Sequence, residues 1–341
     1  MADQEAAATF DEMRALLAAM PGPDESAREK AMARETTLTK PEGALGRLEE
    51  MAAWFASWQG RYPQQLEHPR VAIFAANHGI AAQGVSAYPV SVTAQMVGNF
   101  QAGGAAINQL CLLHDADLRV YEMALDHPTQ DFTEAPAMSE VECARAMAYG
   151  MMAVEDNIDV LCLGEMGIGN TTSAAAICCG LFGGAAADWV GPGTGVAGKG
   201  LQRKIEIVEQ GVALHRDVLS DPFEVLRCLG GQELSAVAGA VLAARIARIP
   251  VILDGFACTA AAAVLKQVDG TALDHCIIGH LSSEPGHAKL LKSIKMRPVL
   301  DLDMRLGEAT GAALALSVLR AAISCHTGMA TFEQARVDGP A

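Results

Sequence analysis

Five short apolar runs, separated by helical stretches, constrain the fold of this chain more than any other feature. The runs are VAIFAANHG (71–79), DLRVYEMAL (117–125), NIDVLCLGEMGIG (157–169), IPVILDGFA (249–257) and DHCIIGHLS (274–282). The helical stretches that separate and follow them are 91–113, 138–154, 171–183, 200–218, 232–246, 256–267 and 284–293. Apolar strands that alternate with helices predict an α/β fold, in which a mostly parallel sheet is covered on both faces.

Both ends of the chain are predicted to be helical. The N-terminal part has helical patterns at 5–20, 26–40 and 44–58, and Asp24 or Ser26 in the break PGPDESA is suited to cap the second of them. A last helix is predicted at 308–323. The length of 341 residues suits one large α/β domain with a smaller one.

Charge and composition exclude several classes of protein. The 25 basic and 40 acidic residues give a formal net charge of −15, which disfavours binding to nucleic-acid phosphates. The acidic N-terminus lacks the apolar core of a secretory signal, and no stretch is apolar enough to predict a membrane span. The nine cysteines form no C-x-x-C pair and lie mostly in apolar runs, as expected in a reducing compartment. We therefore expect a cytoplasmic protein.

Polar residues and glycines gather where the apolar runs end. These ends carry Asn77-His78-Gly79, Glu165 to Asn170, Asp254-Gly255 and His280 to Glu284. Because ligands of parallel sheets bind beyond the carboxyl ends of the strands, we expect the functional site at this edge.

The motif LCLGEMGIGNTTSAAA has the strongest chemical signal. Its strand leads through Glu165 into a turn at 167–170, and an Ala-rich helix follows. Glycines let a backbone approach a ligand closely, and a helix N-terminus attracts phosphate. The motif is neither a P-loop nor G-x-G-x-x-G. By itself it indicates either a phosphate site or a tight turn that Asn or Thr caps.

Two other segments are candidates for ligand contacts. The glycine-rich GPGTG (191–195) precedes Lys199, Arg203 and Lys204, which either neutralise a phosphate or form a solvated helix turn. The loop and helix at 74–110 carry Tyr88, Pro89 and Met96. These either wall a pocket for a flat aromatic ligand or pack against each other.

Metal and hydrolase chemistry are not predicted. His275, His280 and His287 show neither H-x-x-x-H nor H-E-x-x-H spacing. No G-x-S-x-G motif marks an α/β-hydrolase, and Ser282 or Ser283 is better explained as a helix cap.

Glu308 is a lone acid in the small and apolar segment MRLGEATGAALAL (304–316). An acid in the first turn of a helix is common, because the helix dipole favours it. Neighbours such as Leu306, Gly307 and Ala309, however, predict poor solvation, which would raise the pKa toward that of a general base. Glu165 has similar neighbours, so the sequence indicates two poorly solvated carboxylates at the ligand edge.

Taken together, these segments resemble one enzyme family, the nicotinate-nucleotide–dimethylbenzimidazole phosphoribosyltransferases of cobalamin lower-ligand synthesis. The matching segments are KPEGALGRLEEMA (40–52), ANHGIAAQGVSAYPVSVTAQMV (76–97), GEMGIGNTT (164–172), GPGTG (191–195), ILDGF (252–256), HLSSEPGH (280–287) and LDLDMRLGEATGAALAL (300–316). They occur in the family's order over nearly the whole chain.

The resemblance implies transfer of 5-phosphoribose from nicotinate mononucleotide to 5,6-dimethylbenzimidazole, with inversion at the anomeric carbon and no cofactor. It implies Glu308 as general base and Glu165 beside the ribose, where its charge stabilises the oxocarbenium-like transition state. The implied contacts to the nucleotide and its phosphate are Gly167, Ile168, Gly169, Asn170, Lys204, Asp254 and Ser282. The implied base pocket contains Tyr88, Pro89, Gln95, Met96 and Leu306.

The resemblance also implies an architecture. A Rossmann-like, three-layer large domain is expected at 61–304, and a small helical domain is expected from both chain ends, 1–60 with about 305–341. The family is a homodimer whose sites border the interface. The chain departs from the family's usual Asp-His-Gly at Asn77, which removes a negative charge, and from KPPGSLG at 40–46. The first departure bears on base preference.

Two other functions stay open at this point. One is a nucleotide-binding or regulatory protein on the same scaffold, which would not need a desolvated Glu308. The other is a nucleotide N-glycosidase, which would release product without a benzimidazole. A dehydrogenase is disfavoured because no G-x-G-x-x-G follows the first strand.

Overall fold

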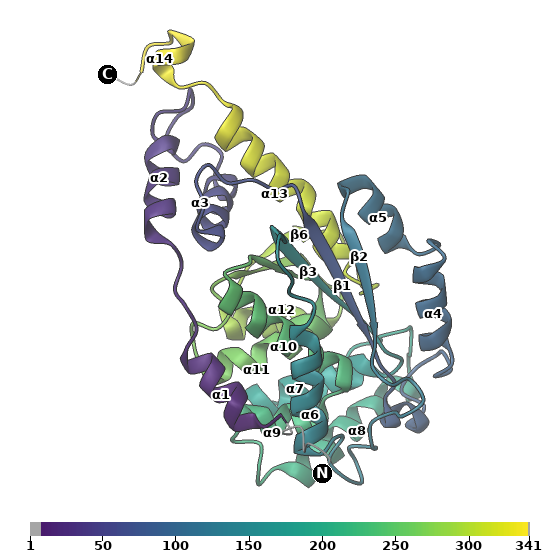
Figure 1. Cartoon of the computed structure of the whole chain (residues 1–341). Helices are drawn as coiled ribbons and strands as arrows, with labels where there is room; N and C mark the ends of the chain where they lie inside the picture. The colour runs from purple at the N-terminus through teal and green to yellow at the C-terminus, as the bar shows by residue number, and fades with distance from the viewer. Residues whose placement is uncertain (1–7, 340–341) are drawn as a thin grey trace, which may run out of the picture.

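A single six-stranded sheet forms the centre of the molecule, in a computed structural model that describes residues 8–339 (Figure 1). Its strands are β1 (Pro69–Ala75), β2 (Asp117–Glu122), β3 (Val160–Met166), β4 (Val251–Leu253), β5 (Cys276–Leu281) and β6 (Pro298–Asp301). All neighbouring strands are parallel, in the order β2-β1-β3-β4-β5-β6. The predicted α/β class is therefore confirmed.

The strand order reverses beside β1. The chain passes from β1 outward to β2 and then returns across β1 to β3, so the crevice at the carboxyl ends of β1 and β3 is a topological switch point. This is the flavodoxin-like order extended by β6, and not the order 3-2-1-4-5-6 of dinucleotide-binding domains. The Rossmann-like prediction thus holds only in the broader sense of a parallel sheet between helices.

The sheet separates two apolar cores. Along β1, Ala72 and Phe74 belong to the core shared with α6, α7, α10 and α11, whereas Val71 and Ile73 face α3, α5 and α13. The alternation of side chains along a strand sends successive residues to opposite faces. Because both faces are covered, the strand needs apolar residues at every position, which explains its continuous apolar run.

The helices surround this sheet. They are α1 (Phe10–Ala18), α2 (Glu25–Glu35), α3 (Arg47–Gln59), α4 (Val92–Gln101), α5 (Ala106–His114), α6 (Glu140–Met151), α7 (Asn170–Phe182), α8 (Lys199–His215), α9 (Pro222–Leu229), α10 (Gln232–Ala247), α11 (Phe256–Val268), α12 (Pro285–Ile294), α13 (Thr310–Gly328) and α14 (Phe332–Ala335). Short 3₁₀ helices occur at Gly79–Gln83 and Ala186–Asp188. The predicted cap Asp24 accepts a hydrogen bond from the backbone N–H of Ala27.

Some sequence predictions of individual elements were wrong. The helix expected at 91–113 is two helices, α4 and α5, because the chain turns at Gly103, whose φ of +79° suits glycine. The strand β6 and the helices α9 and α14 were not predicted. The helix expected at 308–323 begins at Thr310 and continues to Gly328. Part of the first predicted helix, residues 5–7, lies outside the described residues.

Helices α2 and α3, from near the N-terminal end, lie beside α13 of the C-terminal part, whereas the first and last helices, α1 and α14, lie far apart (Figure 1). Leu38 and Thr331 form an antiparallel bridge, and Arg34 donates to the carbonyls of His326 and Met329 near the end of α13. Side chains of α1, in contrast, belong to the core that includes α6 and α10. The division into a small domain, 1–60 with about 305–341, and a large domain, 61–304, stays a prediction.

Two findings bear on the class of protein. No helix of the described residues is long and apolar enough to cross a membrane. All nine cysteines are free thiols, and eight of them are buried.

Candidate active site

A cavity of about 610 Å³ opens at the carboxyl ends of the central strands. Glu165 and Gly167 reach it from β3, Gly255 from the end of β4, and Ser282 from the end of β5. Glu308, which precedes α13, completes this side of the wall. The strand ends therefore converge on one cavity, as their polar residues and glycines indicated.

Glu308 lies in a turn that neighbouring groups hold tightly. Glu308 and Ala309 both have φ of +60°, a backbone conformation that residues other than glycine rarely adopt. The Glu308 N–H donates to the carbonyl of Glu165 at 3.3 Å. A Cβ on Gly164 would overlap the Ala309 nitrogen, so β3 and this turn are in close contact.

Asp254 holds the same turn from the other side. Its Oδ1 accepts hydrogen bonds from the N–H groups of Gly311 (2.7 Å) and Ala312 (3.0 Å) at the start of α13. The side chain is fully buried, and the cavity is lined by Gly255 instead. This carboxylate therefore stabilises the start of α13, directly after Glu308, and the expected contact between Asp254 and a nucleotide stays a prediction.

Two buried carboxyl groups face the cavity with raised pKa values. Burial, followed by the charge of Asp254, raises the pKa of Glu308 to about 7. Burial, then Glu233 and Asp254, raise the pKa of Glu165 to about 8, although Asn170 donates a hydrogen bond to its Oε2. Gly307 brings the two together, because a Cβ there would lie 2.9 Å from Glu165 Oε1. Such values suit groups that exchange protons near neutral pH.

The glycine turn between β3 and α7 forms the floor of the cavity. Gly167, Ile168 and Asn170 line it, whereas Gly169, with φ of +99°, faces Ala81. The N-terminus of α7, a helix of 13 residues, points its positive dipole end at this wall. This arrangement suits an anion.

Lys204 lies behind this wall and does not line the cavity. Its ammonium donates to Thr171 Oγ1 at 2.8 Å and to the Gly191 carbonyl at 3.0 Å, and the side chain is fully buried. Burial lowers its pKa to about 8, against the opposing charge of Glu284. Lys204 thus connects the α7 turn with the GPGTG loop.

The GPGTG loop is fixed from two further directions. The Gly193 N–H donates to Glu284 Oε1 at 2.8 Å, and Arg305 donates to the Gly193 carbonyl at 2.9 Å. Gly193 and Thr194 line the cavity. The loop therefore forms part of the wall, as its glycines indicated.

The predicted base-pocket residues divide into two groups. Tyr88, Met96 and Leu306 line the cavity. Pro89 and Gln95 are exposed and do not line it, because they face outward at the start of α4. The structure thus places three of the five residues on the cavity wall, and their role in binding a base stays a prediction.

Several cavity residues were missed at the sequence level. They are His280, Glu284, Phe256, Thr194 and Arg305. Arg305 had a signal, since it is a charged residue three positions before Glu308 in a glycine-containing segment. His280 and Glu284 were noticed at the strand end but given no role. Thr194 stood inside the GPGTG loop, and Phe256 is an aromatic residue that follows Asp254-Gly255 directly.

Asn77 and His78, the other polar residues of a strand end, do not line the cavity. Asn77 Nδ2 donates to the Leu125 carbonyl at 2.8 Å, and His78 is buried against Glu233 and Ser173. Among residues 8–339, no group of three or more His, Cys, Asp or Glu side chains is arranged to hold a metal ion.

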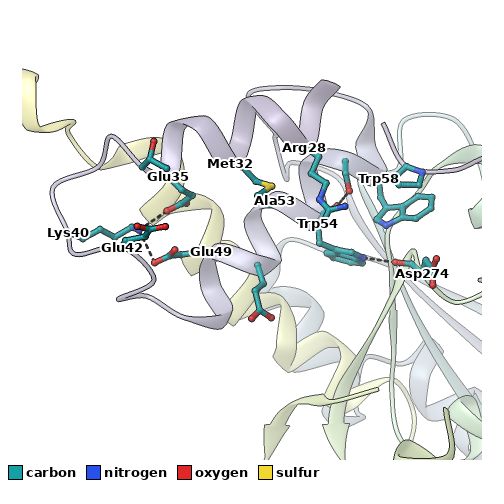
Figure 2. A pocket seen from close by; sticks show the side chains of 14 residues that line it. Arg28, Met32, Glu35, Lys40, Glu42, Glu49, Ala53, Trp54, Trp58 and Asp274 are labelled. Atoms are coloured by element: carbon teal, nitrogen blue, oxygen red, sulfur yellow. Dashed lines mark hydrogen bonds and ion pairs between the residues drawn. The ribbon is translucent and has the colours of Figure 1, made fainter. Parts of the chain in front are cut away.

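A second cavity, of about 580 Å³, lies between α2 and α3 (Figure 2). Trp54 and Trp58 form part of its wall, and Trp54 Nε1 donates to the Asp274 carbonyl at 3.0 Å. Lys40 forms ion pairs with Glu35 at 3.0 Å and Glu49 at 2.8 Å. Lys40 is thus already bound by two carboxylates of the protein.

Comparison with known proteins identifies the family to which this chain belongs. A family model described as phosphoribosyltransferase matches residues 20–337. Proteins of Sinorhizobium medicae and Rhizobium meliloti, each named nicotinate-nucleotide–dimethylbenzimidazole phosphoribosyltransferase, are 60% identical to this chain over 328 residues, covering 96% of this chain and 97% of each relative. A Brucella canis protein of the same name is 58% identical over the same length and coverage.

A solved structure gives the same result. The crystal structure of the enzyme of this name from Thermus thermophilus matches with a TM-score of 0.85 and 41% sequence identity, over 93% of this chain and 100% of that chain. Both the sequence and the fold agree over almost the full length. The chain therefore belongs to the nicotinate-nucleotide–dimethylbenzimidazole phosphoribosyltransferase family.

Proposed function

We propose that this protein transfers 5-phosphoribose from nicotinate mononucleotide to 5,6-dimethylbenzimidazole, giving α-ribazole 5'-phosphate and nicotinate for cobalamin lower-ligand assembly. The observation that carries this proposal is the pair of buried carboxyl groups, Glu308 and Glu165, with raised pKa values on one cavity beside a helix N-terminus. A binding protein has no need of two desolvated carboxylates, since burying them is costly.

Glu308 is the general base of this reaction. The attacking nitrogen of the benzimidazole becomes nucleophilic as the other ring nitrogen loses its proton, and Glu308 takes that proton. A pKa of about 7 leaves a substantial carboxylate fraction at neutral pH while keeping the group basic enough to accept a proton. Attack opposite the leaving nicotinate converts the β-glycoside into an α-glycoside.

Glu165 stabilises positive charge on the ribose. Nicotinate leaves from a pyridinium cation, so its departure needs no acid, and the ribose gains oxocarbenium character. A pyridinium cation beside the two carboxyl groups lowers their pKa values and favours the ionised forms. Asn170, which donates to Glu165 Oε2, orients the carboxylate.

The phosphate binds at the glycine turn. Gly167, Ile168 and Asn170 supply its wall, with Ser282 opposite, and the α7 dipole favours an anion there. Gly169 contributes by shaping the turn, through its positive φ. Lys204 adds a positive charge directly behind Thr171. Asp254 acts by holding the Glu308 turn.

The base occupies the part of the cavity near Tyr88, Met96 and Leu306, with Phe256 as a further apolar wall. Flat aromatic rings pack well against such side chains. Pro89 and Gln95 shape this region from outside. The Asn77 position affects the base only indirectly, because its side chain bonds to the loop at Leu125.

We further propose a cytoplasmic homodimer that needs no cofactor, with sites that border the interface. The support is that Tyr88 and Leu306, which line the cavity, are 55% and 56% exposed in the single chain. Light scattering on the purified protein measures the mass of the oligomer, and a monomeric mass would contradict the proposed homodimer.

One incubation tests the reaction against its alternatives. The protein is mixed with nicotinate mononucleotide and either no base, dimethylbenzimidazole, another benzimidazole, adenine or a phenol, and products are identified by mass and by the anomeric NMR coupling. We expect the α-ribotide of the preferred base. Release of nicotinate without any base would instead identify an N-glycosidase, and no release at all would identify a binding protein.

A further inference from the structure

A buried histidine–glutamate pair lies directly behind the glycine turn of the cavity. His78 follows β1 and Glu233 belongs to the first turn of α10, and His78 Nε2 is 2.6 Å from Glu233 Oε1. Both side chains are fully buried. Ser173 of α7 contacts the other ring nitrogen, Nδ1, at 3.1 Å. Three elements from distant parts of the chain therefore meet at one histidine.

Gly167 lies between this pair and the cavity. A Cβ on Gly167 would be 3.2 Å from Glu233 Oε1 and 3.3 Å from His78 Cδ2, while Gly167 itself lines the cavity. A Cβ on Gly231 would be 2.8 Å from Glu233 Oε2. The glycines thus let a buried carboxylate approach the turn closely, where no bulk water screens its charge.

The contacts of His78 hold the Glu233 side chain in place. The Nε2–H of the imidazole donates to Glu233 Oε1, and the Ser173 hydroxyl contacts the other ring nitrogen, Nδ1. Within the described residues, Glu233 Oε2 is buried without a hydrogen-bond partner. Glu233 thus keeps one carboxylate oxygen without a partner in a buried environment beside the glycine turn.

The charge of Glu233 acts on Glu165. After burial, Glu233 is the largest cause of the raised pKa of Glu165, ahead of Asp254 and Glu308. The polar and titratable groups that face these two carboxyls from the surrounding elements are His78, Ser173, Asn170, Asp254, Cys258 and Glu308.

We propose that Glu233, held by His78, is a positioning residue that keeps Glu165 protonated until a cationic nucleotide enters the cavity. The Glu165 proton then leaves to solvent, so a carboxylate forms beside the ribose when the pyridinium charge is present to stabilise it. This inference rests on the proposed role of Glu165 and extends it, because it assigns the control of that role to a pair outside the cavity.

The pH dependence of kcat/KM tests the inference, because it reports groups of the free enzyme. In Glu233→Gln the rising limb should move to lower pH by about 0.5–1 unit, since one negative charge beside Glu165 is lost. The matched control is Glu35→Gln, which alters a second buried pair, Glu35 with His326 at 2.6 Å, between α2 and α13. The control should leave the limb in place. A loss of activity in Glu233→Gln that is equal at every pH would overturn the proposal.

A double variant covers the case in which Glu233→Gln does not fold. His78→Leu/Glu233→Met replaces both partners by apolar side chains, which a protein tolerates better than one unpaired member. It should shift the limb in the same direction. His78→Gln, which retains the Glu233 carboxylate and a donor to it, should leave the limb unchanged, whereas a shift as large as that of Glu233→Gln would contradict the assignment to charge.

Proton release on substrate binding provides a second readout that needs no turnover. Calorimetry of nicotinate mononucleotide binding at pH 7.5, in buffers of different ionisation enthalpy, counts the protons released. Glu233→Gln should release about a quarter to a half of a proton fewer than the parent protein, because a larger fraction of Glu165 is already ionised before binding. An unchanged release would refute the role of Glu233. If Glu165→Gln releases as many protons as the parent protein, the role of Glu165 itself is wrong instead.

Discussion

The two cavities of this protein are almost equal in volume, about 610 and 580 Å³, but the pKa values of carboxyl groups on their walls are shifted in opposite directions. At the sheet edge, burial raises the pKa values of Glu165 and Glu308. Between α2 and α3, burial alone would raise the pKa of Glu49, but its hydrogen bonds to Lys40 and to the Leu45 N–H outweigh it, and the pKa is lowered.

This difference teaches that volume does not identify a site, whereas unpaired carboxyl groups do. In the second cavity Lys40 lies between the carboxylates of Glu35 and Glu49, as Figure 2 shows, so a ligand that binds any of these groups would have to displace an existing partner. Glu308 and Glu165 lack a basic partner of this kind, so a cationic substrate gains most from them. The predictions below test this comparison.

The largest effect is expected at the sheet-edge cavity. Glu308→Gln keeps the size and polarity of the side chain but removes the base, so kcat should fall by about 10²–10⁴-fold, the usual contribution of a general base. Binding of nicotinate mononucleotide, measured by calorimetry, should change little. Turnover within tenfold of the parent enzyme would show that another group takes the benzimidazole proton.

At the second cavity the effect should fall on stability. Lys40→Met leaves Glu35 and Glu49 close together without their cation, and their side chains are only 12% and 17% exposed. The free energy of unfolding should fall by about 2–3 kcal/mol in denaturant titrations. Turnover of the folded variant should fall by less than tenfold. A larger loss of kcat with unchanged stability would mean that this cavity, too, has a catalytic part.

The pH dependence should distinguish the two cavities next. Both site carboxyls must be ionised in the transition state, and their pKa values are about 8 and about 7. A raised pKa means that the active form is lost as pH falls, so kcat/KM should decrease by about tenfold per unit between pH 8 and pH 7, and by up to about a hundredfold per unit below pH 7, where both groups are protonated. The lowered pKa of Glu49 predicts no such titration in stability over the same range. A flat profile between pH 6 and 8 would contradict both assignments.

The smallest effect is expected at the rim of the first cavity. Tyr88 is half exposed, so Tyr88→Ala should raise the KM for the base by only a few-fold, about 1 kcal/mol or less. Pro89→Ala is the matched control, because Pro89 is exposed next to Tyr88 without lining the cavity. Equal effects of the two substitutions would place the base elsewhere.

Much of the fold could be predicted because its signals are local. The apolar runs around Val71, Val160 and Val251 are strands covered on both faces, which require continuous apolar residues. The strand β6 was not predicted from the sequence because it has only four residues and is half buried. Its side chains therefore give too short a hydrophobic pattern to recognise. The split of α4 from α5 depended on Gly103, and an isolated glycine is a weak signal.

The candidate site could be predicted in part, because strand ends and glycine motifs show where ligands approach. Glu165, Glu308 and Ser282 lie on the predicted cavity. Lys204 and Asp254 do not, because the partners that bury them, Thr171 and the start of α13, are distant in sequence. The pair of His78 with Glu233 could not be predicted for the same reason, because the two residues lie 155 positions apart in the sequence. Contacts that only the tertiary fold creates leave no local pattern.

The positive φ of Glu308 has a consequence for anyone who engineers this protein for heat tolerance. Glycine or asparagine fits this backbone better, so either substitution should stabilise the fold by about 1 kcal/mol. A screen that selects only for melting temperature would therefore enrich variants without the proposed general base, and it would discard the parent protein as the less stable one. Position 308 must be held constant in any such library.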